Sequence, residues 1–509
     1  MYTIGFVLAL FGLLGVALDR ERLRAVRYLL APGVVLWAAS VFTQTSNWQA
    51  LFGQSFRDLL FLGGAMLALR AIATLGKLAV PVGIVAVLCF AGIHRGIALN
   101  PSADTAATAE STMVTNYAPD AELLVELRPS TDSERWKRWI GAKGWTSCPA
   151  FHPQDGDRTD LDDYVMLDLP AGADLADVTQ QLYAADLVDY VEPNEVIKLD
   201  ILPKQDTPIG TSILGINDPE VKRQWAMKAL KINELYELLT SDQVQPQRKA
   251  LVAILDTGVD AQHEDLRANY RSVGKKYDND PQGHGTHCAG IAGAVTNNGV
   301  GVASLARTDK FINITSVKAL RAGGSGTQQD IINAIITATD KGADVLSLSL
   351  GGFSTQSRQR AYSEAVKYAT DRGAIVVAAA GNSNRDAAGY TPVNATGMIG
   401  VSAIDSELQR AQFSNRVGKI AMAVAAPGVG VFSTKPNNTY AAHNGTSMAT
   451  PFVSGLLGIM KSIRPDLTNK EAFKILDKTG IATKNTADTG RLIQPAAAVR
   501  ALVARGADN

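Results

Sequence analysis

Short apolar runs, separated by glycine-rich and polar turns, characterise the second half of the chain. The segments 249–255 (Lys-Ala-Leu-Val-Ala-Ile-Leu) and 374–380 (Ala-Ile-Val-Val-Ala-Ala-Ala) are partly β-branched, which is typical of strands buried within a parallel sheet. Asp256 follows the first segment, and Asn382 follows the second after one glycine. Polar side chains at the carboxyl ends of strands lie where open α/β sheets form their sites. The pattern therefore predicts an α/β domain with a site at these strand ends.

Two further segments predict helices that begin beside reactive side chains. A stretch rich in glycine and alanine suggests a helix packed closely on the sheet, with His284 at its start. Residues 445–451 precede an apolar run of helical character, Phe452–Met460, and we expect Pro451 in the first helical turn. Ser447 then lies at a helix N-terminus, where free N–H groups and the helix dipole favour developing negative charge.

The middle of the chain alternates strand and helix patterns. The strand patterns cover residues 122–127, 163–169 and 189–193, and the helix patterns cover residues 133–141 and 174–187. This β-α-β…α-β order is that of ferredoxin-like α+β domains, and we expect such a domain over residues 119–199. Residues 100–118 are small and polar, which is typical of a flexible linker, and residues 200–216 form a second linker.

The first 99 residues differ sharply from the rest in charge. Residues 1–100 carry eight Lys or Arg and three Asp or Glu, whereas 19% of the whole chain is charged. The apolar runs between these charges cover residues 2–18, 28–42, 59–75 and 78–99. A spanning helix needs about 17–25 residues, and a signal peptide alone would be a single run. We therefore expect a transmembrane region of about four helices, with three spans and one buried or interfacial helix as the alternative.

The arginines predict how these helices are oriented. The loop 19–27 carries four arginines and the loop 44–56 carries no charge, so the positive-inside rule places the first loop in the cytoplasm. With four spans, the chain is a multi-pass protein of the cell (inner) membrane, and the part after residue 99 lies on the extracytoplasmic side. With three spans, that part would be cytoplasmic.

Four residues supply the groups that a nucleophilic serine requires. Attack on a carbonyl needs a nucleophile, a base, an orienting carboxylate and an oxyanion donor. The candidates in chain order are Asp256, His284, Asn382 and Ser447. The order Asp, His, Ser is one of the known orders of the catalytic triad.

The segments around these residues resemble the signature blocks of the subtilisin-like serine proteases, or subtilases. The matching blocks are Asp256-Thr-Gly, His284-Gly-Thr-His, Ala380-Gly-Asn382 and Gly445-Thr-Ser447-Met-Ala, within a resemblance that covers roughly residues 217–503. It implies a subtilisin-like fold over residues 217–509, with helices on both faces of a mostly parallel sheet and a closing helix over residues 490–503. It also implies serine endopeptidase activity on protein or peptide substrates.

The resemblance assigns a role to each of the four residues. Ser447 attacks the scissile carbonyl, His284 transfers the proton, and Asp256 orients the imidazole. The amide of Asn382 and the backbone N–H of Ser447 bind the oxyanion. His287 is expected to be structural, and Cys288 is expected to be a buried, inert thiol.

Two glycine-rich blocks match family segments that hold a substrate as an added β-strand. Their residues are Gly324, Ser325 and Gly326 in one block, and Ser349, Leu350, Gly351 and Gly352 in the other. An ordinary glycine-rich turn remains the alternative for the block that contains Gly324.

Residues 119–199 resemble the inhibitory propeptides of subtilases, both in position and in the ending Val188-Asp-Tyr-Val-Glu-Pro-Asn194. The resemblance implies that this domain is a partner of the protease within the same chain, which helps it fold and blocks its cleft. The chain would then be a zymogen that cleaves itself between residues 196 and 216. An unrelated spacer domain is the alternative.

A structural Ca²⁺ site is also implied by the resemblance. Asp218, Asp265 and Asn298 match the family's ligands, and the backbone carbonyls of Val300 and Val302 would complete a set of hard oxygen ligands. Solvated loop carboxylates are the alternative.

Composition excludes several other functions. The formal net charge is zero, so nothing indicates a nucleic-acid partner. The three cysteines (Cys89, Cys148 and Cys288) are too scattered for a disulfide framework or a metal site. Two rival functions are a catalytically silent fold that only binds, and a membrane sensor or transporter with an appended protease. The intact catalytic positions argue against the first, and the scarcity of ionisable residues within the apolar runs argues against transport.

Overall fold

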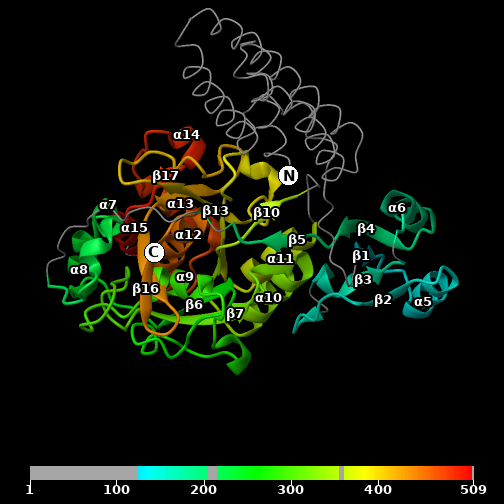
Figure 1. Ribbon diagram of the computed structural model, residues 1–509, viewed down its shortest axis with the longest axis horizontal. Helices are drawn as coiled ribbons and strands as arrows, with labels where there is room; N and C mark the ends of the chain where they lie inside the picture. Colours follow the sequence, from blue (N-terminus) through cyan, green and yellow to red (C-terminus); the bar gives the residue numbers. More distant parts are fainter. Residues whose placement is uncertain are drawn as a thin grey trace, which may run out of the picture. The chain divides into compact units, whose positions relative to one another are not determined.

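The computed structural model describes residues 123–156, 159–170, 172–200, 202, 215–354 and 360–506. The predicted transmembrane region (residues 1–99), the linker 100–118 and most of the linker 200–216 lie outside the described residues. Among the residues described, no helix is long and apolar enough to cross a membrane. The described chain begins with a small four-stranded sheet and continues into a larger α/β part (Figure 1).

A seven-stranded sheet forms the centre of the larger part. Its strand order is β17-β14-β13-β11-β9-β6-β7, and all neighbouring pairs are parallel. The strands are β6 (Ala250–Asp256), β7 (Ile312–Lys318), β9 (Val345–Leu348), β11 (Ile375–Ala379), β13 (Ile399–Ile404), β14 (Ala423–Pro427) and β17 (Arg491–Leu492). The two runs predicted as buried strands are β6 and β11, and every residue of both is buried. The prediction of a mostly parallel sheet is confirmed.

Helices cover both faces of this sheet. The main helices are α8 (Ile232–Thr240), α9 (His284–Gly293), α10 (Gln328–Asp340), α11 (Arg360–Asp371), α12 (Thr446–Ile463), α13 (Asn469–Thr479) and α15 (Pro495–Gly506). Val252 and Ile254 of β6 belong to the same apolar cluster as residues of α9 and α12. Ala253 and Leu255 belong to the cluster of α10 and α11. Because successive side chains of a strand point to opposite faces, this alternation places one helical layer on each face.

Shorter elements complete the larger part. They are α7 (Trp225–Ala229), α14 (Thr486–Thr489), β8 (Ser325–Thr327), the pair β10 (Gly352–Phe353) and β12 (Tyr390–Thr391), and the hairpin β15 (Val431–Lys435) and β16 (Thr439–His443). The predicted closing helix begins at Pro495 and not at residue 490. Arg491 and Leu492 instead pair with Val424 and Ala425 of β14, because the sheet has an open edge there.

Helix α12 begins earlier than the sequence suggests. It starts at Thr446, so Pro451 is its sixth residue, and the prediction that Pro451 lies in the first turn is wrong. Proline has no N–H to donate to the carbonyl four residues earlier, which belongs to Ser447. That carbonyl oxygen accepts instead from the Ser349 hydroxyl at 2.8 Å. The partner from outside the helix makes the proline tolerable inside it.

The small sheet has the strand order β2-β3-β1-β4, with antiparallel neighbours. Its elements are β1 (Leu123–Leu127), α5 (Ser133–Ala142), β2 (Thr146–Pro149), β3 (Tyr164–Asp168), α6 (Leu175–Ala184) and β4 (Val188–Pro193), followed by β5 (Val196–Lys198) outside this sheet. This β-α-β-β-α-β order is ferredoxin-like. The sequence did not predict β2, because its largely exposed residues form no apolar run.

Candidate active site

His284, the first residue of α9, faces the last residue of β6. Its Nδ1 lies 2.8 Å and 2.9 Å from the two carboxylate oxygens of Asp256. The backbone N–H of Thr257 donates to the same carboxylate at 2.8 Å. Asp256 is fully buried, whereas the His284 side chain keeps 14% of its surface exposed. A proton on Nδ1 is the assignment that satisfies this contact, and it leaves Nε2 as the basic atom.

The charge of Asp256 controls the basicity of His284. Burial acts to lower the pKa of His284, because it disfavours the charged imidazolium. Burial is the largest single influence, but the charge and hydrogen bond of Asp256, together with the neighbouring Cys288, outweigh it and hold the pKa of His284 well above its ordinary value. The pair therefore stabilises an imidazolium, as a base that accepts a proton during a reaction requires.

Asp280 fixes the turn that brings His284 to this position, and the sequence analysis did not single it out. One of its oxygens accepts from the Thr257 hydroxyl at 2.8 Å and the Gly283 N–H at 2.7 Å. The other accepts from the N–H and the hydroxyl of Thr286, at 2.8 and 2.7 Å. The only signal in the sequence is an aspartate in a Pro/Gly turn just before the histidine, a pattern common to many turns.

Ser447 is the second residue of α12. Its hydroxyl donates to the carbonyl oxygen of Ser349 at 2.8 Å, so Oγ is turned toward the predicted substrate wall and not toward His284. Catalytic hydrogen bonds often form only when substrate is bound, so this geometry is compatible with a nucleophilic role.

Cys288 lies between the histidine and the serine. Its Sγ is 4.0 Å from Nδ1 of His284 and 3.6 Å from the carbonyl oxygen of Ser447. The residue is completely buried, as predicted, and burial raises the pKa of its thiol. A protonated thiol is a weak nucleophile and a poor metal ligand, so Cys288 acts here as a packing group.

Asn382 is held in the orientation that an oxyanion donor needs. Its Oδ1 accepts from both the N–H and the hydroxyl of Thr446, each at 2.9 Å. This fixes the amide and leaves Nδ2 to donate elsewhere. Asn382 and Ser447 line the same small cavity, so a carbonyl oxygen bound there can meet Nδ2 and the N-terminus of α12 together.

The two predicted substrate walls flank a strand of the chain itself. Ile197 of β5 lies opposite Gly326 of β8 in antiparallel register. The N–H of Leu199 donates to the carbonyl oxygen of Gly324 at 2.9 Å. On the other side, a Cβ added to Gly352 would come within 3.1 Å of Ile197 Cδ1. The cleft therefore holds an extended segment in the way that β-strand addition holds a peptide.

Comparison with known proteins agrees with this geometry. The sequence profile of the subtilase family (Peptidase_S8) matches residues 247–499. Thermitase from Thermoactinomyces vulgaris is 43% identical over 244 residues, which cover 47% of this chain and 81% of thermitase. Subtilisin DY from Bacillus licheniformis is 40% identical over 254 residues, which cover 48% of this chain and 89% of subtilisin DY. The chain belongs to the subtilase family.

Two further proteins, one known by sequence and one by structure, are also similar to this subtilase. The thermophilic serine proteinase of Bacillus sp. (strain AK1) is 33% identical over 346 residues, which cover 67% of this chain and 78% of that proteinase. A solved structure of a protease from Pseudoalteromonas arctica PAMC 21717 aligns with a TM-score of 0.50 and 30% identity, over 56% of this chain and 99% of the other. The protein is a serine endopeptidase with a subtilisin-like fold.

The loops predicted to hold Ca²⁺ come together in this subtilase. Their carboxylates, however, accept hydrogen bonds from N–H groups of the same loops. Asp218 accepts from the backbone N–H groups of Asn297 and Asn298, at 2.7 and 2.9 Å. Asp265 accepts from Asn298 Nδ2 at 2.9 Å and from the Val302 N–H at 2.8 Å. Burial raises the pKa of Asp265 to about 8, a penalty that a bound cation would relieve. The residue types fit Ca²⁺, but the amide of Asn298 must turn to offer its oxygen.

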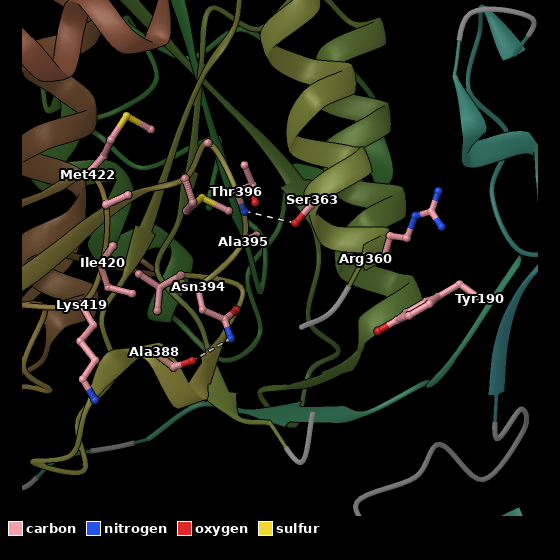
Figure 2. A pocket seen from close by; sticks show the side chains of 14 residues that line it. Tyr190, Arg360, Ser363, Ala388, Asn394, Ala395, Thr396, Lys419, Ile420 and Met422 are labelled. Carbon is pink, nitrogen blue, oxygen red and sulfur yellow. Dashed lines mark hydrogen bonds between the residues drawn. The ribbon is translucent and has the colours of Figure 1, made fainter. Parts of the chain in front are cut away.

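A second cavity lies away from these residues. Figure 2 shows that Arg360 and Ser363 on α11, Tyr190 on β4, and the loop residues Asn394 and Lys419 contribute to its lining. In this cavity the Thr396 N–H donates to the Ser363 hydroxyl at 3.2 Å, and Asn394 Nδ2 donates to the carbonyl oxygen of Ala388 at 3.1 Å (Figure 2). None of the candidate catalytic residues lines this cavity, so it does not compete with the cleft at Ser447.

Proposed function

We propose that this subtilase hydrolyses peptide bonds through an acyl-enzyme on Ser447, with Asp256 and His284 as its acid–base pair. The observation that carries the proposal is the 2.8 Å contact between Asp256 and His284, beside the helix N-terminus that bears Ser447. Oγ bonds to the scissile carbonyl carbon while His284 takes the Oγ proton, and His284 then gives that proton to the departing amine. Water hydrolyses the ester in the reverse sense and restores Ser447.

Replacement of the nucleophile tests this proposal. Ser447→Ala should lower the hydrolysis of a protein substrate by several orders of magnitude, because the triad acts as a unit. The matched control is Ser406→Ala, which removes an exposed hydroxyl and should leave the rate unchanged. Far-ultraviolet circular dichroism of both variants would verify the fold. Activity of Ser447→Ala within tenfold of the wild type would refute the assignment.

The zymogen character is part of the same proposal. The strand β5 in the cleft, and the covalent continuity of β5 with the ferredoxin-like unit, support residues 119–199 as an inhibitor within the same chain. Wild-type protein should separate into an N-terminal fragment of about 200 residues and a protease of about 300 residues, on the size logic of separable domains. Ser447→Ala protein should stay full length on a denaturing gel. Wild-type protein that stays full length while it cleaves substrates would make residues 119–199 a permanent domain.

We also propose that the N-terminal helices tether the protease to the inner membrane, with its catalytic part outside the cytoplasm. The four arginines of the loop 19–27 and an even number of spans support this orientation. A fusion of alkaline phosphatase at Ala107 should be active, and a cytoplasm-dependent reporter at the same position should be silent. The opposite pair of results would mean three spans and a cytoplasmic protease.

A structural Ca²⁺ held by Asp218, Asp265, Asn298 and the carbonyls of Val300 and Val302 completes the proposal. Such an ion would tie the start of the protease part to two of its loops. Thermal unfolding with and without a chelator tests it. The melting temperature should fall when Ca²⁺ is removed, and it should be insensitive to the chelator in Asp265→Asn. Equal melting temperatures of the wild type in both conditions would overturn the calcium proposal alone.

A further inference from the structure

We infer that one flank of helix α5 is a docking surface for a bilayer that contains anionic lipids. The surface consists of Arg135, Arg138 and Trp139 of α5, its C-cap residue Lys143, and Trp145, whose ring lies against that of Trp139. The inference rests on the membrane tether proposed above, which keeps this unit beside a bilayer. It goes further, because a tethered unit can either move freely near the bilayer or bind it through a defined face.

Positive charge is concentrated at this helix within an otherwise acidic unit. Residues 123–198 carry 15 Asp or Glu and 7 Lys or Arg. Four of these seven basic residues lie between residues 135 and 143, and residues 135–154 contain no Asp or Glu. All four basic side chains are exposed. Each Lys or Arg near an anionic bilayer strengthens binding by about fivefold, so this stretch has the sign and the density of charge that such a bilayer attracts.

The spacing of the residues divides the exposed side of α5 into two flanks. Arg135, Arg138 and Trp139 are three and four positions apart, so they share one flank. Lys137 lies on the other flank and pairs with Glu134 at 3.3 Å. Among the residues described, neither Arg135 nor Arg138 forms a salt bridge. The flank of the two arginines therefore carries the uncompensated positive charge.

Two tryptophans lie beside these cations. Trp136 belongs to the core of the unit, since it is only 3% exposed and donates from Nε1 to Ser147 Oγ at 2.8 Å. Trp139 and Trp145 are partly exposed, with ring centroids 5.6 Å apart. The Nζ atom of Lys143 lies 5.6 Å from the ring centroid of Trp139. Tryptophan beside Lys and Arg is typical of surfaces that lie at the headgroup level of a bilayer.

The docking surface and the contact with the protease lie on opposite faces of the small sheet. Helix α5 packs on the cluster that includes Leu123 and Val125 of β1. Leu124 of the same strand belongs to the cluster of α10 and α11 in the larger part. Because successive side chains of a strand point to opposite faces, a bilayer at α5 does not compete with the protease for the same face.

The linker that precedes β1 keeps a bilayer within reach. Residues 100–122 join β1 to the predicted membrane helices. A flexible linker of this length spans about 25 Å on average, which is similar to the diameter of a unit of this size. A tether this short gives docking an effective concentration in the millimolar range, so weak contacts with lipid are sufficient.

The first experiment places a fluorophore on each flank of α5 in the full chain. Ala142→Cys labels the proposed surface, because position 142 is exposed and four residues after Arg138. Gly141→Cys labels the other flank, where an added Cβ has nothing within 4 Å. Cys288 is buried and stays unlabelled. The background variant should not process itself and carries three substitutions: Ser447→Ala, Cys89→Ser and Cys148→Ser.

Lipids with a nitroxide at the headgroup report contact with the bilayer by quenching the fluorophore. In phosphatidylcholine vesicles with about 30% phosphatidylglycerol, quenching at position 142 should be at least about threefold stronger than at position 141. The difference should disappear in pure phosphatidylcholine and in about 1 M NaCl, where the Debye length is about 3 Å. Equal quenching at the two positions would overturn the inference. Shielding of position 142 that depends on neither lipid charge nor salt would mean that protein covers α5, and would also overturn it.

Two matched variants of the labelled chain test the charges. Arg138→Gln and Lys137→Gln each remove one positive charge, from adjacent positions on the two flanks. Arg138→Gln should weaken docking about fivefold, and Lys137→Gln less than about twofold, because Glu134 already compensates Lys137. The dependence of quenching on the fraction of anionic lipid gives both values. Equal losses would mean a response to net charge alone and would contradict a defined surface.

Flotation of the vesicles separates this inference from the tether on which it rests. The full chain should float with the vesicles even in about 1 M NaCl, because apolar helices hold it without help from charge. A chain that floats but shows no charge-dependent quenching at position 142 would overturn the docking surface and leave the tether intact. A chain that does not float would instead overturn the tether.

Discussion

The two sheets of this protein place their polar groups in different ways. The parallel sheet is buried on both faces, and its reactive carboxylate, Asp256, is the last residue of β6. The antiparallel sheet covers one face with its own helices, through a cluster that includes Leu123 and Val125. Its other face contributes Leu124 and Tyr164 to the cluster of α10 and α11 in the larger part. Chemistry thus arises at strand ends in the first sheet, whereas the second sheet uses a whole face for contact.

Each of the two sheets has a buried carboxylate near the end of a strand. The hydrogen-bond partners of each carboxylate determine its role. Asp256 accepts from His284 and so controls a proton. Glu192 at the end of β4 accepts from the N–H groups of Arg360 and Ala361, at 2.7 and 3.1 Å, and from Gln328 Nε2 at 2.7 Å. These backbone N–H groups begin helix α11, where they have no partner within the helix. Glu192 therefore acts as a helix cap supplied by the neighbouring unit. Its role is to hold the two units together, whereas the role of Asp256 is chemical.

The largest expected effect on kcat is a difference between variants of these two carboxylates. Asp256→Asn should lower kcat by about 10⁴-fold, because the amide favours the wrong tautomer of the imidazole. Glu192→Gln, the same chemical change in the other sheet, should leave kcat of the processed protease unchanged. Steady-state kinetics on a peptide substrate provides the measurement. A loss of similar size in both variants would contradict the division of roles.

The next effect tests the oxyanion donor. Asn382→Ala should lower kcat by roughly 10²–10³-fold with little change in KM, because Nδ2 meets a charge that exists only in the transition state. Asn394→Ala, which removes an amide from the cavity in Figure 2, is the matched control and should leave both constants unaltered. If Asn382→Ala changed KM alone, the amide would only position the substrate.

A smaller effect should appear at the contact face of the antiparallel sheet. Glu192→Ala leaves the N–H groups of Arg360 and Ala361 without their acceptor, a loss of about 1–3 kcal/mol for buried groups. The cleaved N-terminal fragment should then dissociate more readily, and the protease activity of a freshly processed sample should rise. Titration of the protease with its own fragment measures this change. Unchanged affinity would mean that β5 alone holds the inhibitor.

The smallest of the expected effects is a shift in the pH dependence of kcat/KM. Because Asp256 raises the pKa of His284, the neutral base should be lost as pH falls through that raised pKa. The acidic limb of kcat/KM should therefore have its midpoint above 6.5, the ordinary value for histidine. Asp256→Asn should move the midpoint downward. A midpoint at or below 6.5 in the wild type would contradict the assigned pairing.

The sequence predicted the parallel sheet better than its surroundings. Strands buried on both faces appear as continuous apolar runs, so β6 and β11 and the polar residues after them could be located directly. Asp280 could not be found in this way, because its importance comes partly from a donor that the fold brings to it, the hydroxyl of Thr257, which is 23 positions away in sequence. The start of α12 could not be predicted for a related reason. Its internal proline depends on Ser349, a residue nearly a hundred positions away in sequence.

The antiparallel part was predictable in outline only. Its helices and three of its strands follow from periodicity, whereas β2 is an exposed edge with little pattern. The capping role of Glu192 depends on helices of the other unit, which no local pattern reveals. The membrane spans, by contrast, follow from hydropathy alone and stay a prediction.

Chemical labelling of the nucleophile tests the central claim most directly. The processed protease is treated with a fluorophosphonate, digested, and mapped by mass spectrometry. We predict one adduct, on the peptide that contains Ser447, with loss of activity in proportion to labelling. Full inactivation with Ser447 unmodified, or an adduct on another residue, would contradict the account.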